Sequence, residues 1–153
     1  MQQFLVTVEA SFKPVNIAYA RARLKPELRR LFEEMSPAEQ HHGIKVCKVL
    51  EHKGFDDPEL LTAALLHDVG KTLMPPHLWE RVFVVLVESA VPRLAKRWRS
   101  EAPQGLRRGF VIRRRHAAWG AELAAEAGAS PKIVTWIRQH HDPAGDDASL
   151  AAL

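Results

Sequence analysis

Cysteine is nearly absent from this sequence, because Cys47 is the single cysteine among 153 residues. One thiol excludes an intrachain disulfide and any zinc site built from several cysteines. The first residues contain no basic stretch followed by an apolar run, so no secretory signal is predicted. The longest uncharged apolar run, Val82 to Val87, is far too short to span a bilayer. These absences predict a protein of the reducing cytoplasm without a membrane span.

Charge is nearly balanced over the whole chain but is uneven along it. Lys and Arg total 22, Asp and Glu total 18, and the formal net charge is +4. Between Arg93 and Arg115, however, nine basic residues stand against a single acidic residue, Glu101. Such a block is either a solvated helix face or a surface that attracts phosphates or nucleic acid. No recognised nucleic-acid-reading motif accompanies it, so nucleic acid is an unsupported alternative.

Strand signals are scarce, whereas helix signals are frequent. Residues 4–8 could form a short strand, but no hairpin partner follows them. Helix starts are marked by a capping residue before proline, and helix stops are marked by glycine. These signals are Ser36-Pro37, Asp57-Pro58, Ser130-Pro131, Gly54, Gly70 and Gly128. The pattern predicts an all-α, single-domain multi-helix bundle over residues 15–153, with an N-terminal arm over residues 1–14.

Two longer segments of this bundle have a distinct character. The stretch from Leu78 to Val91 is nearly all apolar, and Pro92 should end or kink the helix that it forms. We expect a core segment or the surface of a homodimer; the alternative is a helix that binds a membrane surface or a partner. A polar loop over residues 100–109 follows, and the spacing predicts a helix over 110–127.

Eight histidines are many for a chain of this length, and most lie near predicted helix ends. Helix bundles build metal sites from inward-facing side chains on several helices. Imidazole and carboxylate ligands without a thiolate suit divalent manganese, iron, nickel, cobalt, zinc or magnesium. The candidate ligands on this chemistry are His41, His42, His67, Asp68, His116, His140 and His141.

Four segments resemble elements of one known family. Residues 63–71, AALLHDVGK, look like the signature of the HD-domain superfamily, the metal-dependent phosphohydrolases. Residues 39–46, EQHHGIKV, resemble the segment that holds this family's first histidine, and the spacing favours His42 over His41. HAAWG at 116–120 and IRQHH at 137–141 resemble the His-x-x-x-Gly and paired-histidine elements of the HDIG and HD-GYP branches. No Gly-Tyr-Pro follows His141, which argues against a cyclic-di-GMP phosphodiesterase of the GYP type.

The resemblance implies an HD-type helical fold that binds one or two divalent ions. The implied metal ligands are His42, His67, Asp68, His116, His140 and His141. Asp68 is also expected to act in catalysis, together with Lys71, whose ammonium would stabilise charge on the phosphoryl oxygens. Arg114 and Arg115 are predicted to bind substrate phosphates. The resemblance further implies a closing aspartate after the paired histidines; either no such ligand is present, or it is one of Asp142, Asp146 and Asp147.

The sequence thus predicts a metal-dependent phosphohydrolase acting on a nucleotide or another phosphate ester. Its partner would be a phosphorylated small molecule, with a nucleotide as the favoured case. The alternative is a non-catalytic HD-like module with an incomplete metal site, which would bind a nucleotide or a partner protein.

Overall fold

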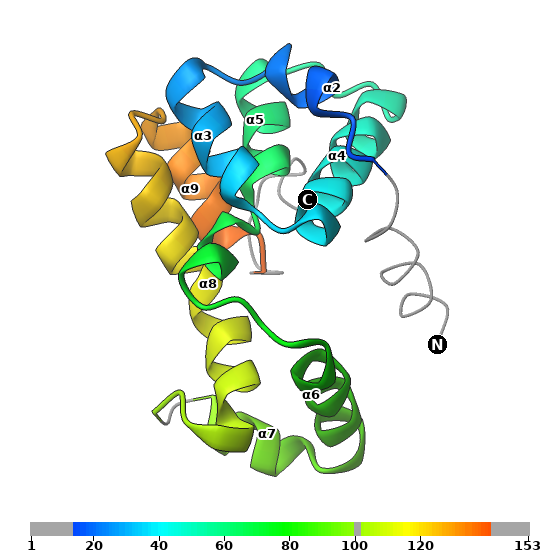
Figure 1. The fold of residues 1–153 in the computed structure, drawn as a ribbon, viewed down its shortest axis with the longest axis vertical. Helices are drawn as coiled ribbons and strands as arrows, with labels where there is room; N and C mark the ends of the chain where they lie inside the picture. The colour runs from blue at the N-terminus through cyan, green and yellow to red at the C-terminus, as the bar shows by residue number, and fades with distance from the viewer. Residues whose placement is uncertain (1–13, 100–101, 142–153) are drawn as a thin grey trace.

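The computed structural model describes residues 14–99 and 102–141, and within these ranges the chain forms helices and no β-strand (Figure 1). The α-helices are α2 (Ile17–Arg21), α3 (Pro26–Glu34), α4 (Pro37–His52), α5 (Pro58–Leu66), α6 (Leu78–Ala90), α7 (Pro92–Trp98), α8 (Arg108–Glu126) and α9 (Pro131–Gln139). Two 3-10 turns, η1 (Val69–Leu73) and η2 (Gly105–Arg107), connect them. The all-α prediction is therefore confirmed. The predicted strand at 4–8 and residues 1–13 of the predicted arm lie outside the described residues.

The predicted helix starts owe their positions to local side-chain caps. The Ser36 hydroxyl accepts a hydrogen bond from the Glu39 amide at the start of α4. The carboxylate of Asp57 and the hydroxyl of Ser130 accept hydrogen bonds from backbone amides in the same way at the starts of α5 and α9. In each helix proline occupies the first turn, where its missing N–H costs nothing. These three starts are confirmed.

A main apolar core joins the helices that will carry the candidate site. Its buried side chains come from α2 to α5, η1, α8 and α9, and the largest include Phe32, Leu50, Leu65, Leu66 and Ile137. In Figure 1 α3 and α9 lie beside α8, with α5 next to α9 and α4 next to α5, and η1 and the end of α9 come close to the middle of α8.

A second, smaller core packs α6 and α7 against the first half of α8. Val84, Ala95 and Phe110 are buried there, and the Trp98 and Phe110 ring centroids are 5.5 Å apart. Pro92 ends the apolar helix at Ala90 and opens α7, as predicted. Several apolar side chains on α6, among them Leu86, are exposed. The homodimer surface in this segment stays a prediction. No helix among the described residues is long and apolar enough to cross a membrane.

The boundaries of two elements differ from the sequence prediction. The helix expected to continue to Gly70 ends at Leu66, and the chain turns into η1. In η1 the backbone of Gly70 lies against α8 so closely that a Cβ there would overlap the carbonyl oxygen of His116. The predicted loop over 100–109 is also shorter, since α8 already begins at Arg108 after η2.

Candidate metal centre

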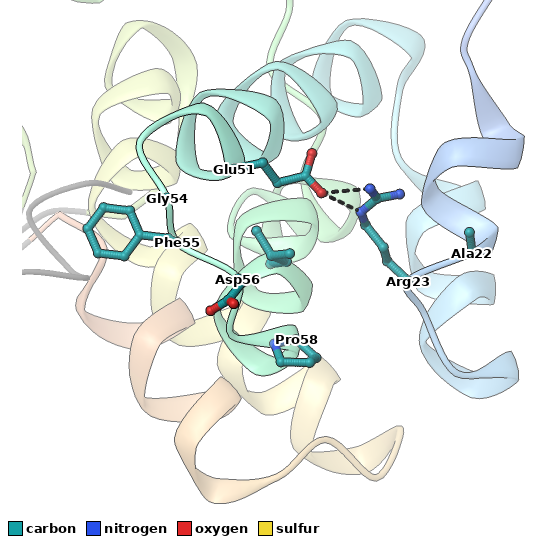
Figure 2. A pocket seen from close by; sticks show the side chains of 8 residues that line it. Ala22, Arg23, Glu51, Gly54, Phe55, Asp56 and Pro58 are labelled. Carbon is teal, nitrogen blue, oxygen red and sulfur yellow. Dashed lines mark hydrogen bonds and ion pairs between the residues drawn. The ribbon is translucent and has the colours of Figure 1, made fainter.

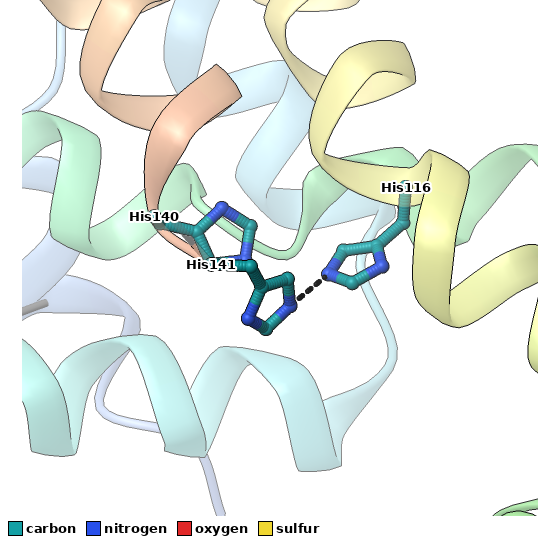
Figure 3. Close-up of side chains that lie close together, drawn as sticks. All are labelled: His116, His140 and His141. Carbon is teal, nitrogen blue, oxygen red and sulfur yellow. Dashed lines mark hydrogen bonds between the residues drawn. The ribbon is translucent and has the colours of Figure 1, made fainter. Parts of the chain in front are cut away.

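Four separate elements bring six of the predicted ligand residues together. One group consists of His42 on α4 with His67 and Asp68 at the end of α5, and its ligand atoms lie within 4.8 Å of one another. A second group, with the same spacing, joins His116 on α8 to His140 and His141 at the end of α9 (Figure 3). His41, the neighbour of His42, belongs to neither group.

The two groups are in direct contact and form one histidine cluster. Nε2 of His116 lies 3.3 Å from Oδ1 of Asp68. The rings of His67 and His140 have centroids 5.0 Å apart, which joins the groups a second time. The histidine cluster is therefore a single centre with one carboxylate near its middle.

Three of the imidazoles are oriented by a backbone carbonyl. Nδ1 of His67 lies 2.8 Å from the Ala64 carbonyl oxygen, and Nδ1 of His116 lies 2.9 Å from that of Ile112. Nδ1 of His140 lies 2.7 Å from the Ile137 carbonyl oxygen. Because a carbonyl only accepts, each neutral ring carries its proton on Nδ1 and keeps a lone pair on Nε2. This is the tautomer that a ring needs in order to bind a metal ion through Nε2.

Two observations show that these residues fit a cation. Nε2 of His140 is buried and has no hydrogen-bond partner among the described residues, although buried polar atoms are nearly always paired. Nε2 of His116 and Nε2 of His141 lie 3.0 Å apart and face each other (Figure 3). The donor set of imidazole nitrogens and one carboxylate is the one that divalent transition metals prefer.

The electrostatics of the centre favour the neutral form of His42, His140 and His141, whose pKa values burial lowers, and the ionised form of Asp68. Burial lowers the pKa of His140 to about 3, and the charge of His67 lowers it further. Burial, followed by the charge of His116, lowers the pKa of His141 to about 4. For Asp68 burial acts to raise the pKa, but His67, the Lys71 ammonium and the contact with His116 together hold it well below its usual value. Near neutral pH these groups are thus in the protonation states that bind metal.

Lys71, predicted as a catalytic residue, reaches the centre. It lies in η1, and its Nζ is 2.6 Å from Oδ1 of Asp68. The two predicted phosphate-binding arginines are placed differently. Arg114 and Arg115 are exposed, and helix periodicity puts Arg114 on the side of α8 opposite His116. Their role stays a prediction, as does that of Asp142, Asp146 and Asp147, which lie outside the described residues.

Three glycines let the elements of the centre approach closely, and the sequence interpretation assigned them no such role. A Cβ on Gly43, next to His42, would lie 2.7 Å from the Leu65 carbonyl oxygen. A Cβ on Gly70 would lie 2.5 Å from the Gly120 amide, besides overlapping the carbonyl of His116. The sequence offered one sign of this role, because each of the three glycines lies within four residues of a predicted ligand.

A surface hollow of about 790 Å³ lies elsewhere. It is lined by residues of the turn after α2, of α4, of the turn before α5 and of α5 itself, including Arg23, Glu51 and Phe55 (Figure 2). Glu51 accepts hydrogen bonds of 3.0 and 2.6 Å from Arg23 inside this hollow. None of its lining residues belongs to the histidine cluster, so we do not place the chemistry there.

Comparison with known proteins identifies the family. The HD domain model matches residues 28–152, and the chain belongs to the HD domain family. The chain is 36% identical over 107 residues to the Multifunctional CCA protein of Methylococcus capsulatus, an alignment that covers 65% of this chain and 25% of that protein. It is 40% identical over 86 residues to the Multifunctional CCA protein of Teredinibacter turnerae, covering 48% of this chain and 21% of that protein. The matches thus span a quarter or less of these relatives. No solved structure matches the chain significantly.

Proposed function

We propose that the protein is a metal-dependent phosphohydrolase that acts on a nucleotide or another phosphate ester. The observation that carries this proposal is that the buried His67 and His116 and the half-buried His140, each with Nδ1 held by a backbone carbonyl and Nε2 left for a metal ion, lie together with Asp68, the one carboxylate of the two ligand groups. One or two divalent ions of manganese, iron, nickel, cobalt, zinc or magnesium would be bound by the cluster residues His42, His67, Asp68, His116, His140 and His141. When bound, such ions supply positive charge to phosphoryl oxygens and acidify water.

The protein's own residues have distinct tasks in this proposal. Ala64, Ile112 and Ile137 orient the imidazoles through their carbonyls, so the ligand atoms are positioned before a metal ion arrives. Asp68 provides the negative charge that the neutral imidazoles lack. The Lys71 ammonium is close enough to Asp68 to contact a phosphoryl oxygen beside it and to stabilise the charge that develops there.

One observation favours the second candidate, a non-catalytic HD-like binding module. Asp68 is the only carboxylate in the two ligand groups of the described residues, and Lys71 already neutralises it. A centre short of carboxylates binds hard divalent ions more weakly.

Turnover separates the two candidates. Protein loaded with manganese, nickel or cobalt is assayed against p-nitrophenyl phosphate, its bis-ester and a panel of nucleotides. We expect hydrolysis by the wild type and by Asp56→Asn, an exposed control of identical chemistry, and none by Asp68→Asn. Metal binding without hydrolysis of any ester would support the binding module and contradict the enzyme.

A further inference from the structure

The exposed side of α4 carries a row of cations that begins beside the metal centre. Lys45, Lys48 and Lys53 are all exposed. At 3.6 residues per turn, Lys45 and Lys48 share one side of the helix with His41 and His52, and His42 borders that side. A surface hollow of about 500 Å³ follows this row. We call the surface the α4 face; it consists of His41, Ile44, Lys45, Lys48, Val49, His52 and Lys53.

The positive charge of the α4 face is not neutralised by its own helix. The two acidic residues of α4 have other partners, since Glu39 is buried and pairs with Arg81. Glu51 accepts hydrogen bonds from Arg23 and from the Tyr19 hydroxyl, both at 2.6 Å. Within the described part of the chain, no carboxylate lies at ion-pair distance from the three lysines. The three lysines of the α4 face therefore have no carboxylate partner among the described residues and can bind an anion; Lys48 also lies over the Tyr19 ring, 5.2 Å from its centroid.

The basic block at 93–115 is less suited to this task. Arg99 and Arg113 both pair with Glu88, at 2.6 and 3.0 Å. Arg108 pairs with the buried Glu80 at 2.6 Å, so these cations serve to fix α6, α7 and α8 against one another. The cationic surface that continues from the metal centre is the α4 face.

The centre also opens to solvent next to α4. His67, Asp68 and His116 are buried, whereas His42 on α4 and His141 after α9 are exposed, so His42 forms one side of the opening. A phosphate ester that reaches Asp68 past His42 has the start of the α4 face beside it. From His41 to His52 the helix extends about 16 Å, which offers room for several nucleotides.

We propose that the substrate is a single-stranded oligonucleotide whose reacting phosphate lies at the histidine cluster and whose neighbouring phosphates bind Lys45, Lys48 and Lys53. This inference rests on the proposed function and extends it from a phosphate ester to a class of substrate. The lysines alternate with the imidazole of His52 and with Val49, which is 42% exposed. Bases pack against imidazole and apolar surfaces, and lysines bind the backbone. An inorganic polyphosphate has no bases that could pack against His52 and Val49.

Binding is tested on the full chain without divalent ions, by fluorescence anisotropy with a fluorescein-labelled decanucleotide between 50 and 200 mM NaCl. The test variant is Lys45→Gln/Lys48→Gln/Lys53→Gln. The matched control, Lys25→Gln/Arg93→Gln/Lys96→Gln, removes the same charge at three exposed positions elsewhere. We expect the test variant to bind about tenfold more weakly at 100 mM NaCl. Its salt slope should fall by about 2, because each single-strand phosphate contact contributes about 0.7.

Each outcome of this experiment is decisive for the α4 face. Equal losses in the two triple variants, or no binding by the wild type, would overturn the proposal. Unlabelled decanucleotide should displace the probe at lower phosphate concentration than inorganic polyphosphate does, and equal displacement would overturn the assignment to an oligonucleotide. Because no metal is present, the result is independent of turnover. Oligonucleotide binding on the α4 face by a protein that hydrolyses no ester would contradict the proposed function alone.

Discussion

The Lys71 ammonium lies 2.6 Å from Oδ1 of Asp68, in the first turn that follows the histidine–aspartate pair. An ammonium and a divalent cation would therefore compete for the charge of one carboxylate. We expect Lys71→Met to bind Mn²⁺ a few-fold more tightly, since one positive charge beside the ion is removed. Turnover should fall about 100-fold, because the charge that stabilises the phosphoryl oxygens is lost with it.

Calorimetric titration with Mn²⁺ and initial rates on the same preparation of Lys71→Met measure the two effects separately. Tighter binding with slower turnover supports a catalytic lysine. A variant that keeps wild-type turnover would show that Lys71 only balances the charge of Asp68.

Gly70 and Gly120 form the close backbone contact that positions η1, and with it Asp68, next to α8. Gly70→Ala would place a methyl group on the His116 carbonyl and the Gly120 amide, so η1 must shift away from α8. We expect a loss of about 2 kcal/mol in the free energy of unfolding, within the range for overpacked sites. The affinity for Mn²⁺ should fall about tenfold or more, because Asp68 moves with η1.

Gly128→Ala is the matched control for this prediction. Gly128 has φ of 79° after the end of α8, so alanine is strained there, but a Cβ meets no atom within 4 Å. The control should lose stability and keep its metal affinity. Urea unfolding and metal titration of both variants measure these quantities, and equal metal affinities in the two would contradict the positional role of Gly70.

The stability of the metal-free protein should depend on pH through His140. Its pKa is about 3 in the folded state, mainly because of burial, against an ordinary value of 6.5. Between these values the unfolded state binds a proton that the folded state does not bind, so folding weakens as the pH falls. We expect the free energy of unfolding to fall by about 1.4 kcal/mol per pH unit from this histidine between pH 6 and 4.

Urea unfolding in a chelator at several pH values between 7.5 and 4.5 tests this slope. His140→Gln should make the slope shallower without abolishing it, because the pKa of His141 is also lowered, to about 4. The exposed His52→Gln should leave the slope unchanged. Asp68 does not interfere in this window, because its folded pKa is depressed and its contribution is lost only at still lower pH. Identical slopes for wild type and His140→Gln would contradict the prediction.

The local chemistry of the sequence predicted most helix boundaries, because these depend on neighbouring residues. Ser36, Asp57 and Ser130 each cap a helix with their own side chain. The end of α5 could not be predicted in this way. The turn that follows it lies against α8 through Gly70 and His116, which are far apart in the sequence and meet only in the folded chain.

The candidate site was predicted as a set of residues but not as a geometry. The family resemblance brought out the histidine pair His140 and His141, and the structure places both beside His116. Nδ1 of His140 faces the Ile137 carbonyl because of the way the chain turns at the end of α9. Sequence spacing alone did not reveal this ring orientation. Arg114 and Arg115 directly precede His116 and were expected to bind substrate phosphates near it. Adjacent residues on a helix point about 100° apart, so neighbours in the sequence need not face the same site.

Metal content tests the central claim most directly. Protein stripped with a chelator is reconstituted separately with manganese, iron and nickel, dialysed and measured by elemental analysis, together with Asp68→Asn and the exposed control Asp56→Asn. The account predicts at least one divalent ion per chain in the wild type and in the control, and a large loss in Asp68→Asn, with the helical circular dichroism of all three unchanged. A wild-type chain that retains none of the three metals would contradict the metal centre and the phosphohydrolase proposal with it.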